Sequence, residues 1–191
     1  MSIRPFALAE LALLTLLALL TLLIGAAGCS DDASCPTPTT EVSLIDHAKW
    51  QKVELKDDPW AANLPAEATC GAGAFKAEAG ALEFDTGVCN FITLQQPSQA
   101  AVESCDELRI VFWHLPLYAG PKGADALAEL RLGEHSLLKV EKPIPPEGAI
   151  EASFTPKHRL NTTIAAGTPI RIHVQNHGLN TWKLLSAVAA R

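Results

Sequence analysis

The side chains best able to do chemistry in this chain are histidines and tryptophans near two apolar runs. His114 follows Trp113 at the end of one run, and His173, His177 and Trp182 lie on or just beyond the other. Imidazole nitrogens bind zinc or copper, whereas indole rings offer flat apolar faces to sugars. The cluster therefore indicates a metal site, a glycan site or a structural network.

A metal site would use His114, His173 and His177. On a helix the spacing of His173 and His177 would place both rings on one face, but the flanking residues predict a strand, where four residues span roughly 13 Å. His114 and His177 can meet only if their two strand ends are neighbours. In the structural alternative, the imidazoles simply satisfy the backbone groups of loops.

A glycan site would pair aromatic platforms with hydrogen-bonding side chains. The tryptophans can equally belong to the core, because aromatic residues within apolar strands are commonly buried. The candidate ligand-binding residues are Trp113, His114, Tyr118, Asn176, His177, Asn180 and Trp182.

Known catalytic motifs are absent from the sequence. It contains no G-x-S-x-G, no H-E-x-x-H and no P-loop. Residues 71–76 begin like a dinucleotide loop, but Lys76 occupies the third glycine position, so a turn is predicted there. We therefore expect no catalysis and no cofactor.

The elements that position these residues are predicted to be strands. Apolar and polar residues alternate in three segments, which is typical of half-buried strands, and three others are rich in β-branched and aromatic residues, which is typical of central strands. The alternating segments are 53–56, 82–85 and 150–155, and the central ones are 91–95, 108–115 and 170–175.

Three further segments complete the expected secondary structure. Gly133 and Glu134 predict a tight hairpin turn, because glycine tolerates the positive φ that such a turn needs. The proline-rich residues 142–146 are expected to end the second hairpin strand. Residues 124–130 are the one segment with a helical composition.

About eight short strands joined by Pro- and Gly-rich connections predict an all-β fold, an antiparallel β-sandwich. The closing run from Ile170 to Gly178, followed by Asn180 and Trp182, resembles the galactose-binding-like jelly roll of carbohydrate-binding modules and of uncharacterised bacterial surface lipoproteins. The resemblance spans residues 43–189. It implies a jelly-roll domain that binds a glycan or another envelope component.

Residues 1–28 have the composition of a secretion signal. Arg4 precedes an uncharged leucine-rich run, which ends in four small residues. An uncleaved membrane anchor is the alternative, but Glu10 interrupts the apolar stretch and no basic cluster follows it.

The residues Ala26-Ala27-Gly28-Cys29 resemble the lipobox of bacterial lipoproteins. The resemblance implies that Cys29 becomes the acylated N-terminus and that its acyl chains anchor the protein in the lipid bilayer. Because Ser30 and not Asp follows the cysteine, it also implies the outer membrane of a Gram-negative bacterium. Ordinary signal cleavage, with Cys29 as a structural thiol, is the alternative.

Apart from Cys29, the chain has four cysteines, which are Cys35, Cys70, Cys89 and Cys105. This even number predicts two disulfides in an oxidising compartment. Three connectivities are possible. We favour Cys70 with Cys89 and Cys35 with Cys105, because the first pair flanks one strand-like stretch.

The charge balance excludes one class of partner. The 191 residues carry 15 Lys and Arg against 21 Asp and Glu, a net charge of −6, and no basic block could follow a nucleic-acid backbone.

The expected organisation is a signal peptide at 1–28, a flexible tether at 29–41 and a β-sandwich domain at 42–191. Glycan or envelope-component binding without catalysis is the expected function, with metal binding or a purely structural protein-interaction role as alternatives.

Overall fold

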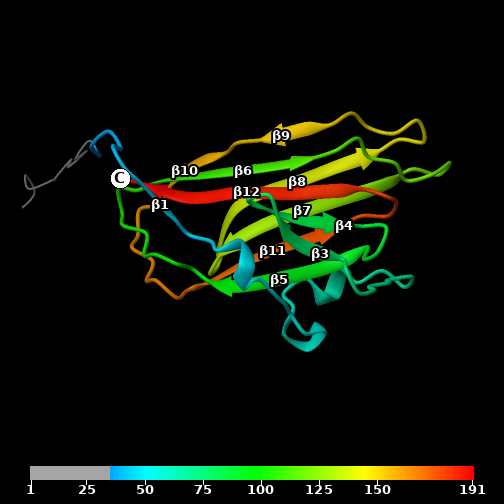
Figure 1. Ribbon diagram of the computed structural model, residues 1–191, viewed down its shortest axis with the longest axis horizontal. Helices are drawn as coiled ribbons and strands as arrows, with labels where there is room; N and C mark the ends of the chain where they lie inside the picture. The colour runs from blue at the N-terminus through cyan, green and yellow to red at the C-terminus, as the bar shows by residue number, and fades with distance from the viewer. Residues whose placement is uncertain (1–34) are drawn as a thin grey trace, which may run out of the picture. The chain divides into compact units, whose positions relative to one another are not determined.

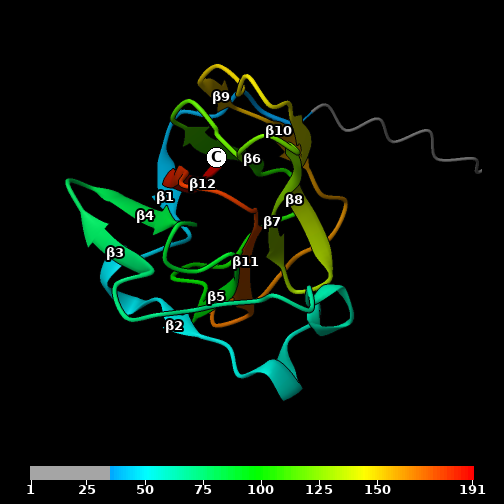
Figure 2. The same cartoon turned by 90° about the vertical axis from the view of Figure 1, so that its right-hand side faces the viewer.

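The computed structural model describes residues 35–191, and the predicted leader and Cys29 lie outside this part. Within it, twelve strands form two antiparallel sheets, viewed across the strands in Figure 1 and along the strands in Figure 2. The strands are β1 (Glu41–Ser43), β2 (Gln51–Lys52), β3 (Phe75–Glu78), β4 (Ala81–Asp85), β5 (Phe91–Pro97), β6 (Glu107–His114), β7 (Ala124–Leu132), β8 (His135–Ile144), β9 (Ala152–Phe154), β10 (Lys157–Arg159), β11 (Pro169–Gln175) and β12 (Thr181–Ala190). Three short 3₁₀ helices are η1 (His47–Lys49), η2 (Leu55–Asp57) and η3 (Ala61–Asn63).

The order of the strands defines a jelly roll. One sheet runs β10-β6-β12-β4-β3, with β1 added beside β12 and β9 beside β6, and the other runs β2-β5-β11-β7-β8. From β4 onward the chain crosses between the sheets after β4, β5, β6, β8, β10 and β11, and β4 and β12 are neighbours in the first sheet. Two sheets of interlocked antiparallel strands with these connections form a jelly roll. The predicted fold class is confirmed.

Alternation along the strands builds the core. In β6 every second side chain is buried, so that Leu108, Ile110, Phe112 and His114 face inward. Trp182 of β12 stacks on Phe112, with ring centroids 5.7 Å apart. Burying a large apolar side chain of this kind contributes roughly 1.5–3 kcal/mol.

The two ends of the sandwich carry different parts of the chain. In the β6–β12 pairing, Ala190 faces Glu107 at one end and Trp182 faces His114 at the other. The amides of Thr39 and of the residue after it donate to the Arg191 carbonyl, so the chain enters beside its own C-terminus. The β6–β7, β8–β9 and β11–β12 loops lie at the opposite end, on the right in Figure 1 and about 25 Å away by strand rise.

The hairpin between β7 and β8 turns at Gly133, whose φ is +56°, as predicted. The expectation of a helix at residues 124–130 is wrong, because this segment is the first part of β7. This segment pairs with β11 on one edge and with β8 on the other, and it buries Ala126, Ala128 and Leu130 in the core. These interactions outweigh its helix-forming composition.

Two other local predictions differ from the structure, and a third is confirmed. The segment 53–56 is not a strand, since after Val53 the chain leaves β5 and forms η2. β8 ends at Ile144, directly before Pro145 and Pro146, so the predicted end of this strand within residues 142–146 is confirmed. Pro143 still belongs to the strand, opposite Asp125, because β8 is an edge strand, where proline is tolerated. The closing strand is β12 rather than the run at 170–175, which is β11.

Disulfides cross-link the described chain. Cys70 and Cys89 form the expected bond, and Cys35 and Cys105 are disulfide-bonded as well. The pairing of Cys35 with Cys105 stays a prediction. Disulfides indicate an oxidising, exported environment. Among residues 35–191, none of the helices has the length and hydrophobicity needed to cross a bilayer.

Candidate functional site

Tyr118, in the β6–β7 loop, is the one mostly exposed aromatic residue between residues 35 and 191, with 57% of its surface accessible. It borders a cavity of about 570 Å³ at the end of the sandwich remote from the C-terminus. We call this cavity the Tyr118 site. Its lining residues come from the β6–β7 and β8–β9 loops and are Pro116, Tyr118, Glu147, Gly148, Ala149, Ile150 and Glu151.

Asn180 holds the backbone of Tyr118 from one side. The Asn180 side chain accepts a hydrogen bond from the Tyr118 amide and donates one, 3.1 Å long, to the Tyr118 carbonyl. Asn180 itself is only 2% exposed. A single buried amide therefore satisfies both backbone groups of an otherwise exposed residue.

Two glycines allow the neighbouring loops to close against Tyr118. Gly148 has φ +89°, and a Cβ there would lie 3.0 Å from two ring carbons of Tyr118 and 2.8 Å from the Leu117 carbonyl oxygen. Gly178 has φ +115°, and a Cβ there would collide with the Tyr118 carbonyl oxygen. Leu117 and Ala149 add a two-bond bridge between the β6–β7 and β8–β9 loops. The Tyr118 ring is thus exposed but fixed at its base.

The other predicted residues of the β11–β12 loop, Asn176 and His177, have polar contacts within the protein. Asn176 donates to the Thr86 hydroxyl, 3.0 Å away, and this hydroxyl donates in turn to the carbonyls of Gly178 and Asn180. His177 is half-buried, and its Nε2 lies 3.1 Å from a Glu67 carboxylate oxygen. These contacts set the loop that carries Asn180.

Trp182 and His114 are completely buried, which corrects their prediction as ligand-binding residues. Their rings lie 4.7 Å apart between the sheets. His114 Nδ1 donates to the Leu115 carbonyl at 2.7 Å, and Nε2 accepts from Lys142 Nζ at 3.2 Å. Burial lowers the pKa of His114, consistent with the neutral ring that accepts from Lys142. His114 therefore joins the two sheets.

Trp113 lies on the outer face of β6, in the sheet that contains β12. It does not line the Tyr118 site. The Lys183 ammonium sits 5.4 Å from its ring centroid and 2.6 Å from a Glu83 carboxylate oxygen. Trp113 is thus partly covered by a cation held by an ion pair, and it does not join Tyr118 in one platform.

His173 belongs to a separate cluster on the outer face of β11. Residues 53–69, which we call the strap, run over this face, and Trp60 of the strap stacks on His173 with centroids 4.9 Å apart and planes 7° apart. His173 Nδ1 lies 2.8 Å from the Thr93 hydroxyl, while Nε2 is buried without a protein partner. Burial lowers the pKa of His173 to about 4, so the ring is neutral at pH 7.

Glu129 and Arg131 of β7 fix Trp60 on the sheet. The Trp60 indole N–H donates to Glu129 at 3.0 Å, Arg131 donates to the same carboxylate at 2.7 Å, and the guanidinium carbon lies 4.7 Å from the Trp60 ring centroid. Burial alone would raise the pKa of Glu129, but hydrogen bonds from Arg131, Trp60 and Ser136 outweigh it, so the pKa is lowered. An ionised carboxylate thus holds the strap down.

The three histidines of the proposed metal site do not meet. His114 lies between the sheets, His173 under the strap and His177 in the β11–β12 loop, and each has its own hydrogen-bond partner. In the part of the chain that the structure covers, no group of three or more His, Cys, Asp or Glu side chains could hold a metal ion. The structural-network alternative accounts for His114 and His173.

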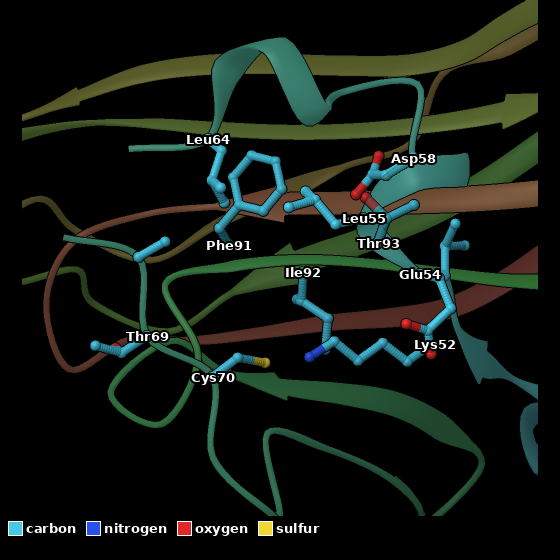
Figure 3. A pocket seen from close by; sticks show the side chains of 12 residues that line it. Lys52, Glu54, Leu55, Asp58, Leu64, Thr69, Cys70, Phe91, Ile92 and Thr93 are labelled. Carbon is cyan, nitrogen blue, oxygen red and sulfur yellow. The ribbon is translucent and has the colours of Figure 1, made fainter. Parts of the chain in front are cut away.

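A second cavity, of about 280 Å³, lies between the strap and β5 (Figure 3). Phe91, Leu55 and Leu64 form an apolar wall, and Lys52, Glu54 and Asp58 add charged groups. None of these residues was selected from the sequence. This strap cavity is smaller than the Tyr118 site and is lined by no mostly exposed aromatic residue.

Sequence reasoning also missed Ile150, Glu147, Glu151 and Leu179. Ile150 is 82% exposed, although its alternation with Ala152 predicted an inward-facing strand residue. Leu179, 79% exposed, lies against Gly87. The strand begins only at Ala152, so the alternation of residues 150–155 did not reveal the position of Ile150 or Glu151, and the fold alone brings these residues to the end of the sandwich that carries Tyr118.

Comparisons with known proteins give distant likenesses. No protein-family model matches the chain, and no curated protein sequence matches it. Similar solved structures include a CBM61 module in complex with beta-1,4-galactotriose (TM-score 0.37, 13% identity, 78% of this chain and 99% of that chain) and a CBM4 module (0.40, 11%, 81% and 97%). A cyclase from Fischerella sp. TAU is similar at TM-score 0.42 and 14% identity, over 80% of this chain and 98% of the cyclase.

An arabinose-bound GH51 α-L-arabinofuranosidase matches 79% of this chain at TM-score 0.41 and 8% identity, and the chain spans 24% of that enzyme's length. These low scores support no transfer of a function. The fold assignment rests on the strand order itself.

The first prediction concerns Asn180. Asn180→Ala leaves both backbone groups of Tyr118 without their partner, so we expect the free energy of unfolding to fall by about 1–3 kcal/mol in urea titrations. Asn161→Ala, at an exposed asparagine, is the matched control and should change stability by less than about 0.5 kcal/mol. Equal effects of the two substitutions would contradict the assigned role.

The second prediction is a pH dependence from His173. Because its pKa is near 6.5 in the unfolded chain and about 4 in the folded one, the unfolded chain binds the proton first as the pH falls. Above pH 6.5 His173 has no effect, and between pH 6.5 and 4 stability should fall by about 3 kcal/mol.

His173→Gln should remove this part of the pH dependence, measured by denaturant unfolding at pH 7 and pH 4. The exposed His135 provides the control, since His135→Gln should keep the wild-type dependence. An unchanged dependence in His173→Gln would show that other groups cause it.

Proposed function

We propose that this protein is a non-catalytic, lipid-anchored envelope protein whose jelly roll binds a glycan at the Tyr118 site. The observation that carries the proposal is Tyr118, a residue that is 57% exposed although its backbone is held by Asn180 and by two adjacent loops. Folding gains little from an exposed ring. A fixed, exposed aromatic face is suited to binding.

The chemistry of the cavity fits a sugar. A pyranose presents an apolar C–H face, which packs on an aromatic ring, and hydroxyl groups, which need acceptors at its edge. Glu147 and Glu151 supply carboxylate acceptors, while Pro116 and Ile150 supply apolar surface beside the ring. Because the loops are tied together, little conformational entropy is lost on binding.

The position of the Tyr118 site fits an anchored protein. The chain enters the sandwich at the end that carries Thr39 and Arg191, and the Tyr118 site lies at the opposite end. With acyl chains on Cys29, the membrane would be on the tether side and the binding end would be free to reach its ligand. The outer membrane, as implied by Ser30, is part of this proposal.

Glycan binding is tested with Tyr118 variants on a glycan array, followed by titration of the best ligand. Tyr118→Phe keeps the ring and should bind within about twofold of wild type, whereas Tyr118→Ala should lose about tenfold in affinity. Leu55→Ala, beside the strap cavity, is the control and should bind normally. Absence of any glycan ligand for the wild type, or full binding by Tyr118→Ala, would refute the proposal.

Anchoring is tested in cells. Cys29→Ala should block processing and leave a larger, unacylated precursor in the membrane fraction, while Ser30→Ala should be processed and acylated. Release of the wild-type protein in soluble, non-acylated form would show that Cys29 is not an anchor.

A further inference from the structure

The charge of the Tyr118 site comes from two carboxylates. Glu147 and Glu151 both belong to the β8–β9 loop and both line the cavity that Tyr118 borders. The remaining lining residues are uncharged, and Lys122, in the same loop as Tyr118, does not line the cavity. The cavity therefore combines an aromatic face with a net negative charge.

Neither carboxylate is neutralised by the protein. The ion pairs found among the described residues involve other carboxylates, so Glu147 and Glu151 are available to a ligand. Both side chains are exposed, and the chain as a whole carries a charge of −6. The two carboxylates near the ligand and the net negative charge of the whole chain thus both favour a cationic ligand over an anionic one.

We propose that the Tyr118 site selects glycans that carry protonated amines, that is, oligomers of 2-amino sugars, and discriminates against neutral and acidic glycans. This inference rests on the proposed glycan-binding function and adds the charge of the ligand. The pyranose packs on Tyr118, and its ammonium group lies between the carboxylates of Glu147 and Glu151.

Other occupants fit the observations less well. An anionic bilayer would be repelled by the two carboxylates, although the exposed Ile150 and Leu179 could insert into it. A basic peptide would satisfy the carboxylates, but the flat and rigid Tyr118 face suits a sugar ring better than a flexible lysine chain. These occupants serve as alternative outcomes of the test.

The test compares two probes that differ in charge and not in ring structure. The purified protein is titrated by calorimetry with a glucosamine tetramer and with an N-acetylglucosamine tetramer at a pH at which the amines are protonated. We expect the glucosamine tetramer to bind several-fold more tightly, and this advantage to shrink at about 0.5 M salt, where charge attraction is screened.

Variants assign the charge effect to the cavity. Glu147→Gln and Glu151→Gln each keep an acceptor oxygen but lose the charge, so each should weaken binding of the glucosamine tetramer by about two- to fivefold more than binding of the acetylated tetramer. Glu134→Gln changes the net charge equally but lies in the β7–β8 turn at the opposite end, so it should change neither affinity. Tyr118→Ala should weaken both tetramers.

The outcomes separate the two proposals. Equal affinity for the two tetramers would overturn the preference for amines and leave glycan binding intact. Binding of neither tetramer, with a glycan array that shows no other ligand, would refute glycan binding itself. Tighter binding to a lysine-rich peptide or to vesicles of anionic lipid than to the glucosamine tetramer would replace the amino sugar as the ligand class.

Discussion

The side chain of Asn180 holds together the end of the sandwich at which the candidate site lies. Its two hydrogen bonds to the Tyr118 backbone join the β11–β12 loop to the β6–β7 loop, and the Leu117–Ala149 bridge extends the connection to the β8–β9 loop. Because Asn180 is buried, breaking these bonds would leave polar groups unsatisfied at a cost of about 1–3 kcal/mol. The exposed ring of Tyr118 and the cavity beside it depend on this constraint.

Core residues at the ends of β6 and β12 stabilise the same end of the sandwich. Trp182, at the start of β12, packs between Phe112 and His114, and Lys142 reaches from β8 to His114 in the opposite sheet. A buried neutral imidazole that donates to one group and accepts from another ties the sheets together without a buried charge on the ring. The loops thus project from a rigid base, which is the arrangement that a binding site on loops requires.

The fold could be predicted because its signals are periodic. Two-residue alternation and β-branched runs identified the segments that became β4, β5, β6 and β11, and Gly133 marked the hairpin turn. Residues 124–130 could not be placed from composition, since only pairing with β11 and β8 makes them a strand. The strap was missed because Trp60 gains its partners, His173, Glu129 and Arg131, from strands that are distant in sequence.

The candidate site was predicted only in part for the same physical reason. Tyr118 and Asn180 were selected for their chemistry, and the fold brings them into contact, but one is exposed and the other is its buried support. Trp182 and His114 were assigned to a ligand because their types fit one, yet their positions on inward-facing sides of strands make them core. Glu147 lies outside the alternating segments and Glu151 lies in one of them, but neither position in the sequence indicates contact with Tyr118, so their place beside Tyr118 follows only from the strand order.

Amide hydrogen exchange at Tyr118 tests the central claim most directly, because it reports on the backbone under the exposed ring. If Asn180 holds this backbone, the Tyr118 amide should exchange far more slowly than an unstructured amide of the same sequence, even though its side chain is in solvent. Exchange of the Tyr118 amide at the unprotected rate in the wild-type protein would contradict the account, since the ring would then sit on a mobile loop and not on a fixed base.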